Sequence, residues 1–127
     1  MDWAEDLPEG CPPEDTVAPN AEIFFRAVLT FPPTESDFYS PRKLYPDKEY
    51  SNECEAKALS VFSTLDGCQR LQRFSFFRNH LITSLPLGTG CGLIKSNPSA
   101  TSNTHYDWWL AAGFNPVPLC TEAGRVL

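Results

Sequence analysis

Short apolar, aromatic and β-branched segments, separated by prolines, glycines and polar turns, predict a fold of several short strands. The clearest segment is residues 22–30, Glu-Ile-Phe-Phe-Arg-Ala-Val-Leu-Thr, which ends at a Phe-Pro-Pro turn and predicts a central strand. Side chains alternate between the faces of a strand, so Phe24, Arg26 and Val28 are expected to share one face. Residues 33–48 are rich in proline and polar residues, which predicts an irregular crossing.

Capping residues predict two short helices in the middle of the chain. Asn52 stands three positions before Glu55, which is the spacing of a capping box, and a helix is expected to run to about Ala58. Ser63 or Thr64 can cap a second helix, because an acidic residue and an apolar stripe follow.

Residues 59–62, Leu-Ser-Val-Phe, fit two interpretations. Their composition is typical of a short strand. However, Cys54, Ala58, Val61 and Leu65 also fall on one apolar stripe at helical spacing. The sequence leaves both alternatives open.

Three further strands are predicted in the second half, over residues 80–87, 91–95 and 105–110. The first two flank Gly-Thr-Gly at 88–90, which predicts a hairpin turn rather than a phosphate-binding loop, because no helix follows. Residues 113–127 show little pattern. The elements together predict an α+β fold, a small mainly antiparallel sheet with one or two short helices on a face.

The first 20 residues differ from the rest of the chain. They contain four prolines, which predicts an acidic Pro-rich N-terminal arm over 1–20 that contributes little to folding, followed by a single globular α+β domain over 21–127. Residues 1–22 hold seven of the 16 acidic side chains and none of the ten basic ones, so the remainder carries a net charge of +1. This balance disfavours nucleic-acid binding and leaves a protein as the expected partner.

Cysteine and terminal patterns indicate a compartment. The five cysteines are odd in number and have no paired short spacing, which predicts five free thiols and a reducing environment. The acidic start of the chain is unlike a secretory signal, and no apolar run is long enough to span a membrane. A cytoplasmic protein without a membrane partner is expected. The two histidines lie 25 residues apart, so no metal is expected.

The segment 104–110, Thr-His-Tyr-Asp-Trp-Trp-Leu, is the densest candidate site. It follows a polar loop and brings together an imidazole, a carboxylate and two indoles. The candidate catalytic residues are His105 and Asp107. The candidate ligand-binding residues of this segment are His105, Trp108 and Trp109.

Two hypotheses extend this site to other segments. In a nucleophilic arrangement, Ser60 or Cys91 would pair with His105, and Asp107 would orient the imidazole. Arg26 is a charge in the middle of an aromatic strand, which is costly to bury without a partner. It is expected either to pair with a structural carboxylate or to bind an anion in a cleft.

Two short motifs resemble small bacterial ADP-ribosyltransferase-like domains. In that family an aromatic-Arg pair on the first strand contacts the dinucleotide, and Phe25-Arg26 matches it. A later strand of the family carries Ser-Thr-Ser. Here Ser63-Thr64 matches two positions, and Leu65 replaces the last serine.

The resemblance implies NAD as cofactor, with Arg26 on its phosphates, Ser63 near a sugar, and His105 or Asp107 in the chemistry. The family supplies a catalytic glutamate late in the domain. This chain departs from that pattern, because it has no glutamate between positions 56 and 121, and Glu122 follows in the tail.

Two functions are therefore expected from the sequence. The first is a small cytosolic interaction or accessory module, in a bacterial toxin–antitoxin or phage-defence setting, which needs no cofactor. The alternative is an NAD- or phosphate-handling enzyme of ADP-ribosyltransferase-like fold. The sequence leaves open whether the protein is an enzyme. Its segments 59–62 and 105–109 also resemble short bacterial open reading frames of unassigned function.

Overall fold

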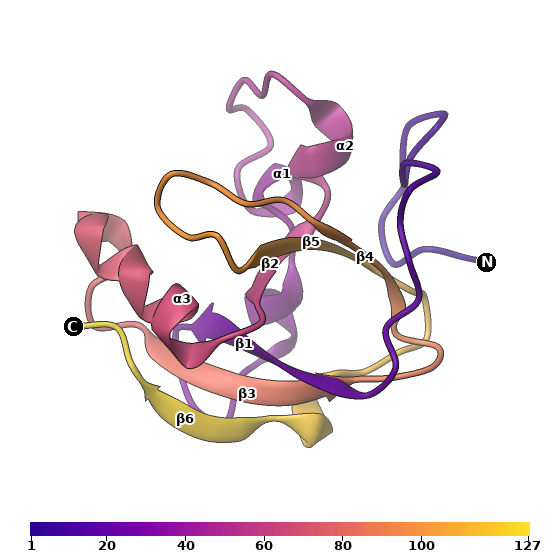
Figure 1. Ribbon diagram of the computed structural model, residues 1–127. Helices are drawn as coiled ribbons and strands as arrows, with labels where there is room; N and C mark the ends of the chain where they lie inside the picture. The colour runs from indigo at the N-terminus through magenta and orange to yellow at the C-terminus, as the bar shows by residue number, and fades with distance from the viewer.

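Six antiparallel strands form one sheet in the computed structural model, which describes residues 1–127 (Figure 1). The strand order across the sheet is β4-β5-β2-β1-β3-β6. The predicted hairpin at 88–90 is therefore wrong, because β3 pairs with β1 and β6 whereas β4 pairs with β5. The predicted α+β class, with a mainly antiparallel sheet, is confirmed. The strands are β1 (Glu22–Val28), β2 (Leu59–Phe62), β3 (Leu81–Leu87), β4 (Gly92–Ser96), β5 (His105–Leu110) and β6 (Thr121–Arg125).

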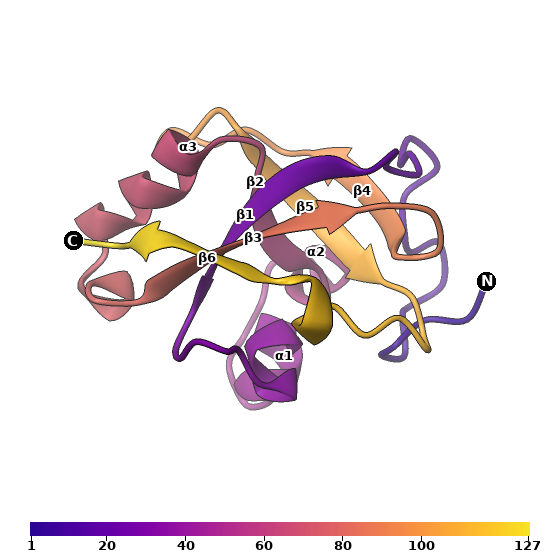
Figure 2. The ribbon, with the colours of Figure 1, turned by 90° about the horizontal axis from the view of Figure 1, so that it is seen from below.

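Three short α-helices and four 3₁₀ turns connect the strands. The helices are α1 (Pro41–Leu44), α2 (Glu53–Ala56) and α3 (Leu65–Gln69). Figures 1 and 2 show α3 on a different side of the sheet from α1. The 3₁₀ turns are η1 (Glu35–Phe38), η2 (Arg70–Arg73), η3 (Ser75–Phe77) and η4 (Val117–Leu119).

Asn52 and Thr64 both cap helices, although α2 ends at Ala56, before the predicted end near Ala58. The Asn52 side chain accepts from the backbone N–H of Glu55 at the start of α2, and the Thr64 side chain accepts from that of Gly67 at the start of α3. The segment between these helices is a strand, because β2 pairs with β5 over its whole length. The tertiary pairing decides between the two interpretations that the sequence left open.

The sheet curves around its main core (Figure 1). Alternate residues point inward, and the buried side chains of this interior cluster are Phe24, Phe38, Leu59, Val61, Leu85, Leu87, Cys91, Ile94 and Trp108. A smaller cluster lies on the outer face beneath α3 and consists of Phe62, Cys68, Ile82 and Val126. Both faces of the central strands are therefore covered.

Strands β1 and β2 part almost as soon as they meet. β1 pairs with β3 at seven positions, but with β2 only at Phe25 and Phe62. Arg26 starts on the interior face with Phe24, and its Nη1 crosses the gap to donate to the backbone oxygen of Ser60 at 2.7 Å. The Arg26 side chain thus bonds to β2 where the next backbone pair between β1 and β2 would otherwise form.

The N-terminal segment packs against the sheet at both of its ends. Trp3 forms a β-bridge with Ala111, and Val17 forms one with Ile94. Between them, the Glu5 carboxylate accepts from both the hydroxyl and the backbone N–H of Ser40, which is fully buried. Residues 1–20 therefore make more contacts with the rest of the chain than their prolines suggested.

The cysteine prediction is wrong, because Cys11 and Cys54 form a disulfide. Cys68, Cys91 and Cys120 remain free. The partners lie 43 residues apart in sequence and meet only because the N-terminal segment crosses α2. The pairing also removes the cysteine-based argument for a reducing compartment.

Strand β6 lies in a segment for which the sequence predicted no element. Its residues, Thr-Glu-Ala-Gly-Arg, include no large apolar side chain and show no alternation. β6 is an edge strand that pairs only with β3, so it forms without burying such side chains. No helix of the structure has both the length and the apolar character that crossing a membrane requires.

Candidate functional site

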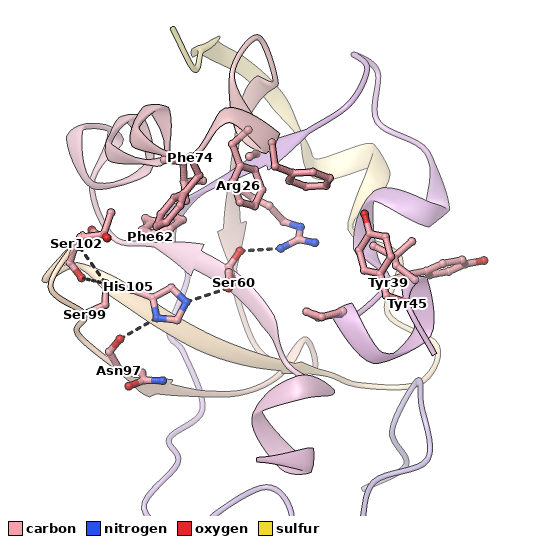
Figure 3. A pocket seen from close by; sticks show the side chains of 17 residues that line it. Arg26, Tyr39, Tyr45, Ser60, Phe62, Phe74, Asn97, Ser99, Ser102 and His105 are labelled. Carbon is pink, nitrogen blue, oxygen red and sulfur yellow. Dashed lines mark hydrogen bonds between the residues drawn. The ribbon is translucent and has the colours of Figure 1, made fainter. Parts of the chain in front are cut away.

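A cavity of about 450 Å³ opens where β1 and β2 part (Figure 3). Its floor comes from the outer face of β2 and β5 and from Arg26, which reaches across the gap. In Figure 3, Tyr39 and Tyr45 lie on one side of Arg26 and Ser60, and Phe74 and the loop 97–102 lie on the other. The lining residues are Arg26, Ala27, Tyr39, Pro41, Leu44, Tyr45, Ser60, Phe62, Leu71, Phe74, Phe76, Phe77, Asn97, Ser99, Thr101, Ser102 and His105.

Arg26 is held by backbone oxygens alone. Its Nε and Nη2 donate to the carbonyl oxygen of Asp37 at 3.0 and 2.8 Å, and its Nη1 donates to that of Ser60. None of the ion pairs in the structure includes Arg26. A guanidinium has five N–H donors, so two remain without a protein acceptor.

The charge on Arg26 persists at neutral pH. Burial lowers the pKa of Arg26 to about 10, and the nearby charge of Asp37 opposes this effect. The Phe38 ring lies 5.6 Å from the guanidinium carbon and adds a cation–π contact. Arg26 is also the only Asp, Glu, Lys or Arg side chain that lines the cavity. The cavity therefore presents one cation and no carboxylate.

Ser60 and His105 form a hydrogen-bonded pair on the floor (Figure 3). The Ser60 Oγ lies 2.9 Å from His105 Nε2, and His105 Nδ1 lies 2.8 Å from the backbone oxygen of Asn97. A carbonyl oxygen can only accept, so Nδ1 of the neutral ring carries the proton. Nε2 is then the acceptor, and the Ser60 hydroxyl donates to it.

Asp107 lies behind this pair rather than in the cavity. It is 6% exposed, and its Oδ2 accepts from Asn97 Nδ2 at 2.9 Å. Its Oδ1 is 3.9 Å from His105 Nε2. Burial raises the pKa of Asp107, while the neighbouring His105 and the hydrogen bond from Asn97 oppose the rise. Asp107 can therefore stabilise a charged His105, but it does not hold Nδ1.

Among the predicted site residues, the structure brings Arg26 and His105 into one cavity and leaves Ser63 outside it. Ser63 is exposed, and its backbone N–H donates to Thr104. Glu122 pairs with Thr83 on the edge of the sheet and does not line the cavity.

The prediction that Trp108 and Trp109 bind a ligand at the surface is wrong, because both are fully buried. Trp108 points into the interior core and donates from Nε1 to the Cys91 backbone oxygen. Trp109 points outward, but α2 covers it, and its Nε1 donates to the Cys54 backbone oxygen. Consecutive residues of a strand both become buried when each face of the sheet is covered.

The candidate site residues from the sequence did not include the aromatic side chains that line this cavity. Tyr39 and Tyr45 flank α1 in a segment that the sequence marked only as an irregular crossing, whereas Phe74 and Phe76 follow α3. Tyr45, Phe74 and Phe76 are exposed and Tyr39 is half-buried. Nothing in the sequence distinguishes them from aromatic residues of a core. Tyr45 and Phe76 meet edge to face with ring centroids 6.4 Å apart.

A second cavity, of about 580 Å³, lies beside the N-terminal segment and is lined by Trp3, Glu5 and Phe114 among others. It lacks a pair like Ser60 and His105. The smaller cavity is therefore the better candidate site.

Comparison with known proteins adds no relative, because no protein-family model, curated protein or solved structure matches the chain.

Proposed function

We propose that the protein binds a small anionic ligand with a flat aromatic part, of the nucleotide type, in the cavity between β1 and β2. The observation that carries this proposal is Arg26. It is a persistent cation with two unused N–H donors, in a cavity whose lining holds no carboxylate. A planar guanidinium is well suited to a phosphate, because it can donate two parallel hydrogen bonds.

The remaining walls suit the aromatic part of such a ligand. Tyr39, Tyr45 and Phe76 provide flat apolar surfaces across the cavity from the polar floor. The volume of about 450 Å³ falls in the range of small-molecule sites. Polar groups at one end and rings at the other match a phosphate joined to a base.

NAD is the first ligand to test. In the family that the motifs resemble, the aromatic-Arg pair contacts this dinucleotide. Of the matching Phe25-Arg26 pair on β1, Arg26 lines the cavity. The late glutamate of that family has no counterpart in the lining. The proposal therefore concerns binding of NAD or a similar phosphorylated ligand and does not include the family's transferase step.

Thermal unfolding with NAD, AMP or inorganic phosphate tests the proposal. A ligand that binds only the folded state stabilises it by about 2.7 kcal/mol at a hundredfold excess over its dissociation constant. Arg26→Lys should lose most of this stabilisation, because lysine keeps the charge but not the planar donor pair. Arg125→Lys, at an exposed position outside the cavity, is the matched control. Failure of all three ligands to raise the melting temperature of the wild type contradicts the proposal.

A second candidate is an interaction or accessory module of a toxin–antitoxin or phage-defence system. The observation that favours it is the exposure of Leu44, Tyr45, Phe74 and Phe76 at the rim of the same cavity. Exposed apolar side chains that lie together often mark a protein interface. This candidate predicts a protein that co-purifies from the native host with the wild type but not with Phe76→Ser.

A further inference from the structure

Ser60 is placed where a nucleophile needs to be. Its neighbours Leu59 and Val61 point into the interior core, so strand alternation turns the Ser60 side chain to the outer face, at the cavity floor. β2 is an inner strand of the sheet, and the backbone oxygen of Ser60 is bonded to Arg26. The hydroxyl is therefore exposed while its backbone is fixed.

His105 is held in the orientation of a general base. Its Nδ1–H is bound to the Asn97 carbonyl oxygen at 2.8 Å, which leaves the Nε2 lone pair directed at the Ser60 hydroxyl. A nucleophile, a base and a group that orients the base make up the arrangement that activates serine in unrelated hydrolases. Here a backbone carbonyl takes the orienting role that a carboxylate plays in a triad.

A negative and a positive side chain, Asp107 and Arg26, lie next to the Ser60–His105 pair. Asp107 Oδ1, 3.9 Å from His105 Nε2, stabilises the imidazolium that forms when His105 takes the serine proton. Arg26 bonds the backbone oxygen of Ser60, so its guanidinium lies beside the nucleophile. Its unused N–H donors can stabilise negative charge that develops on a group attached to Ser60.

We infer that Ser60 is a nucleophile activated by His105 and that the cavity hydrolyses carboxylic esters. This inference concerns the same cavity as the proposed function, but it rests on the Ser60–His105 pair and does not require NAD to bind.

The reaction proceeds through an acyl-serine. Ser60 Oγ bonds to the carbonyl carbon of the ester as its proton moves to His105 Nε2, and the carbonyl oxygen becomes an oxyanion beside Arg26. The bond from carbon to the alcohol oxygen then breaks, and the alcohol leaves with the proton from Nε2. Water next gives a proton to Nε2 and attacks the acyl group. Ser60 leaves with that proton, and the carboxylic acid is released.

A fluorophosphonate probe tests the nucleophile. Attack by Ser60 Oγ on phosphorus expels fluoride and leaves a stable covalent adduct, which intact-mass measurement counts. We expect one adduct per wild-type chain, located by peptide mapping on the peptide that contains Ser60. Ser60→Ala should abolish labelling, and His105→Ala should slow it at least about 100-fold, which is the usual size of general-base catalysis.

Ser63→Ala is the matched control, because Ser63 is exposed on the same segment but lies outside the cavity. It should label at the wild-type rate. Hydrolysis of p-nitrophenyl acetate should show the same ranking of the variants. Absence of an adduct from the folded wild type, or an adduct mapped to another residue, would overturn the inference. The mapping needs no variant, so the test stands even if Ser60→Ala fails to fold.

The labelling experiment and the ligand-binding experiment can fail independently of each other. Loss of ligand-induced stabilisation with intact Ser60 labelling rejects the nucleotide ligand alone. Stabilisation by NAD without Ser60 labelling rejects the nucleophile alone.

Discussion

The indole Nε1 of Trp109 donates to the backbone oxygen of Cys54 at 3.0 Å. Cys54 is in turn bonded through its sulfur to Cys11. One hydrogen bond and one disulfide therefore connect β5, α2 and the N-terminal segment into a continuous unit. This connection explains why the Trp109 indole is buried although it lies on the outer face of the sheet. The disulfide also changes the number of free thiols that a titration should detect.

Thiol titration should detect three free cysteines in the denatured, unreduced protein. Cys11 and Cys54 are paired, and Cys68, Cys91 and Cys120 are not. Before denaturation, Cys68 and Cys91 should react slowly with thiol reagents, because burial raises their pKa to about 12 and about 11 and keeps the reactive thiolate scarce. A count of five in freshly prepared protein would contradict the pairing.

Glu5→Ala should destabilise the protein by about 1–3 kcal/mol, because it leaves the fully buried Ser40 without its acceptor. Glu14→Ala is the control, since Glu14 is exposed on the same segment. Urea unfolding measures both. Equal stabilities for the two variants would show that the N-terminal arm contributes as little as its sequence suggested.

Gly92→Ala should cost at least about 2 kcal/mol, whereas Gly88→Ala should stay within about 0.5 kcal/mol of the wild type. A methyl carbon at Gly92 would lie 1.9 Å from the Trp109 backbone oxygen, and the residue has a φ of +124°. A methyl carbon at Gly88 meets no atom within 4 Å. Thermal unfolding of both variants checks the difference, and similar losses at the two positions would be evidence against the predicted contact.

Asp107→Asn should gain stability relative to the wild type as the pH rises above about 4, the ordinary pKa of an Asp in an unfolded chain. Burial raises the pKa of Asp107 in the folded protein, so the unfolded chain releases this proton at a lower pH. The wild type loses stability as the pH rises through the window between the two pKa values, and the amide does not. The amide oxygen can still accept from Asn97. Melting temperatures across this pH range measure the effect, and parallel profiles would contradict it.

Local signals in the sequence predicted much of the fold. Asn52 and Thr64 cap helices through their own side chains, and the aromatic run around Arg26 forms a strand because its residues suit a pleated, covered surface. The sequence also pointed to Arg26 and His105 as site residues and to Ser60 as a partner of His105, and the three lie together. Each of these predictions depends on residue type or on neighbours along the chain.

The features that sequence reasoning missed depend on distant parts of the chain. Trp109 is buried because α2, which lies more than 50 residues earlier in the chain, covers the outer face of β5. Cys11 and Cys54 have no recognisable spacing, because the route of the N-terminal segment brings them together. The prediction of a surface made by both tryptophans assumed one open face, and the sheet has none at that position.

The gap between β1 and β2 has a consequence for motion. Backbone pairing is continuous within β4-β5-β2 and within β1-β3-β6, but Phe25 and Phe62 alone pair the two sets. Few backbone hydrogen bonds join the two sets, although the interior core packs against both. We therefore expect backbone amides next to the gap to exchange faster than those within either set. Arg26 belongs to one side of the gap, and Ser60 and His105 belong to the other. A ligand that contacts all three residues would bridge the two sets, and we expect it to slow amide exchange along both β1 and β2.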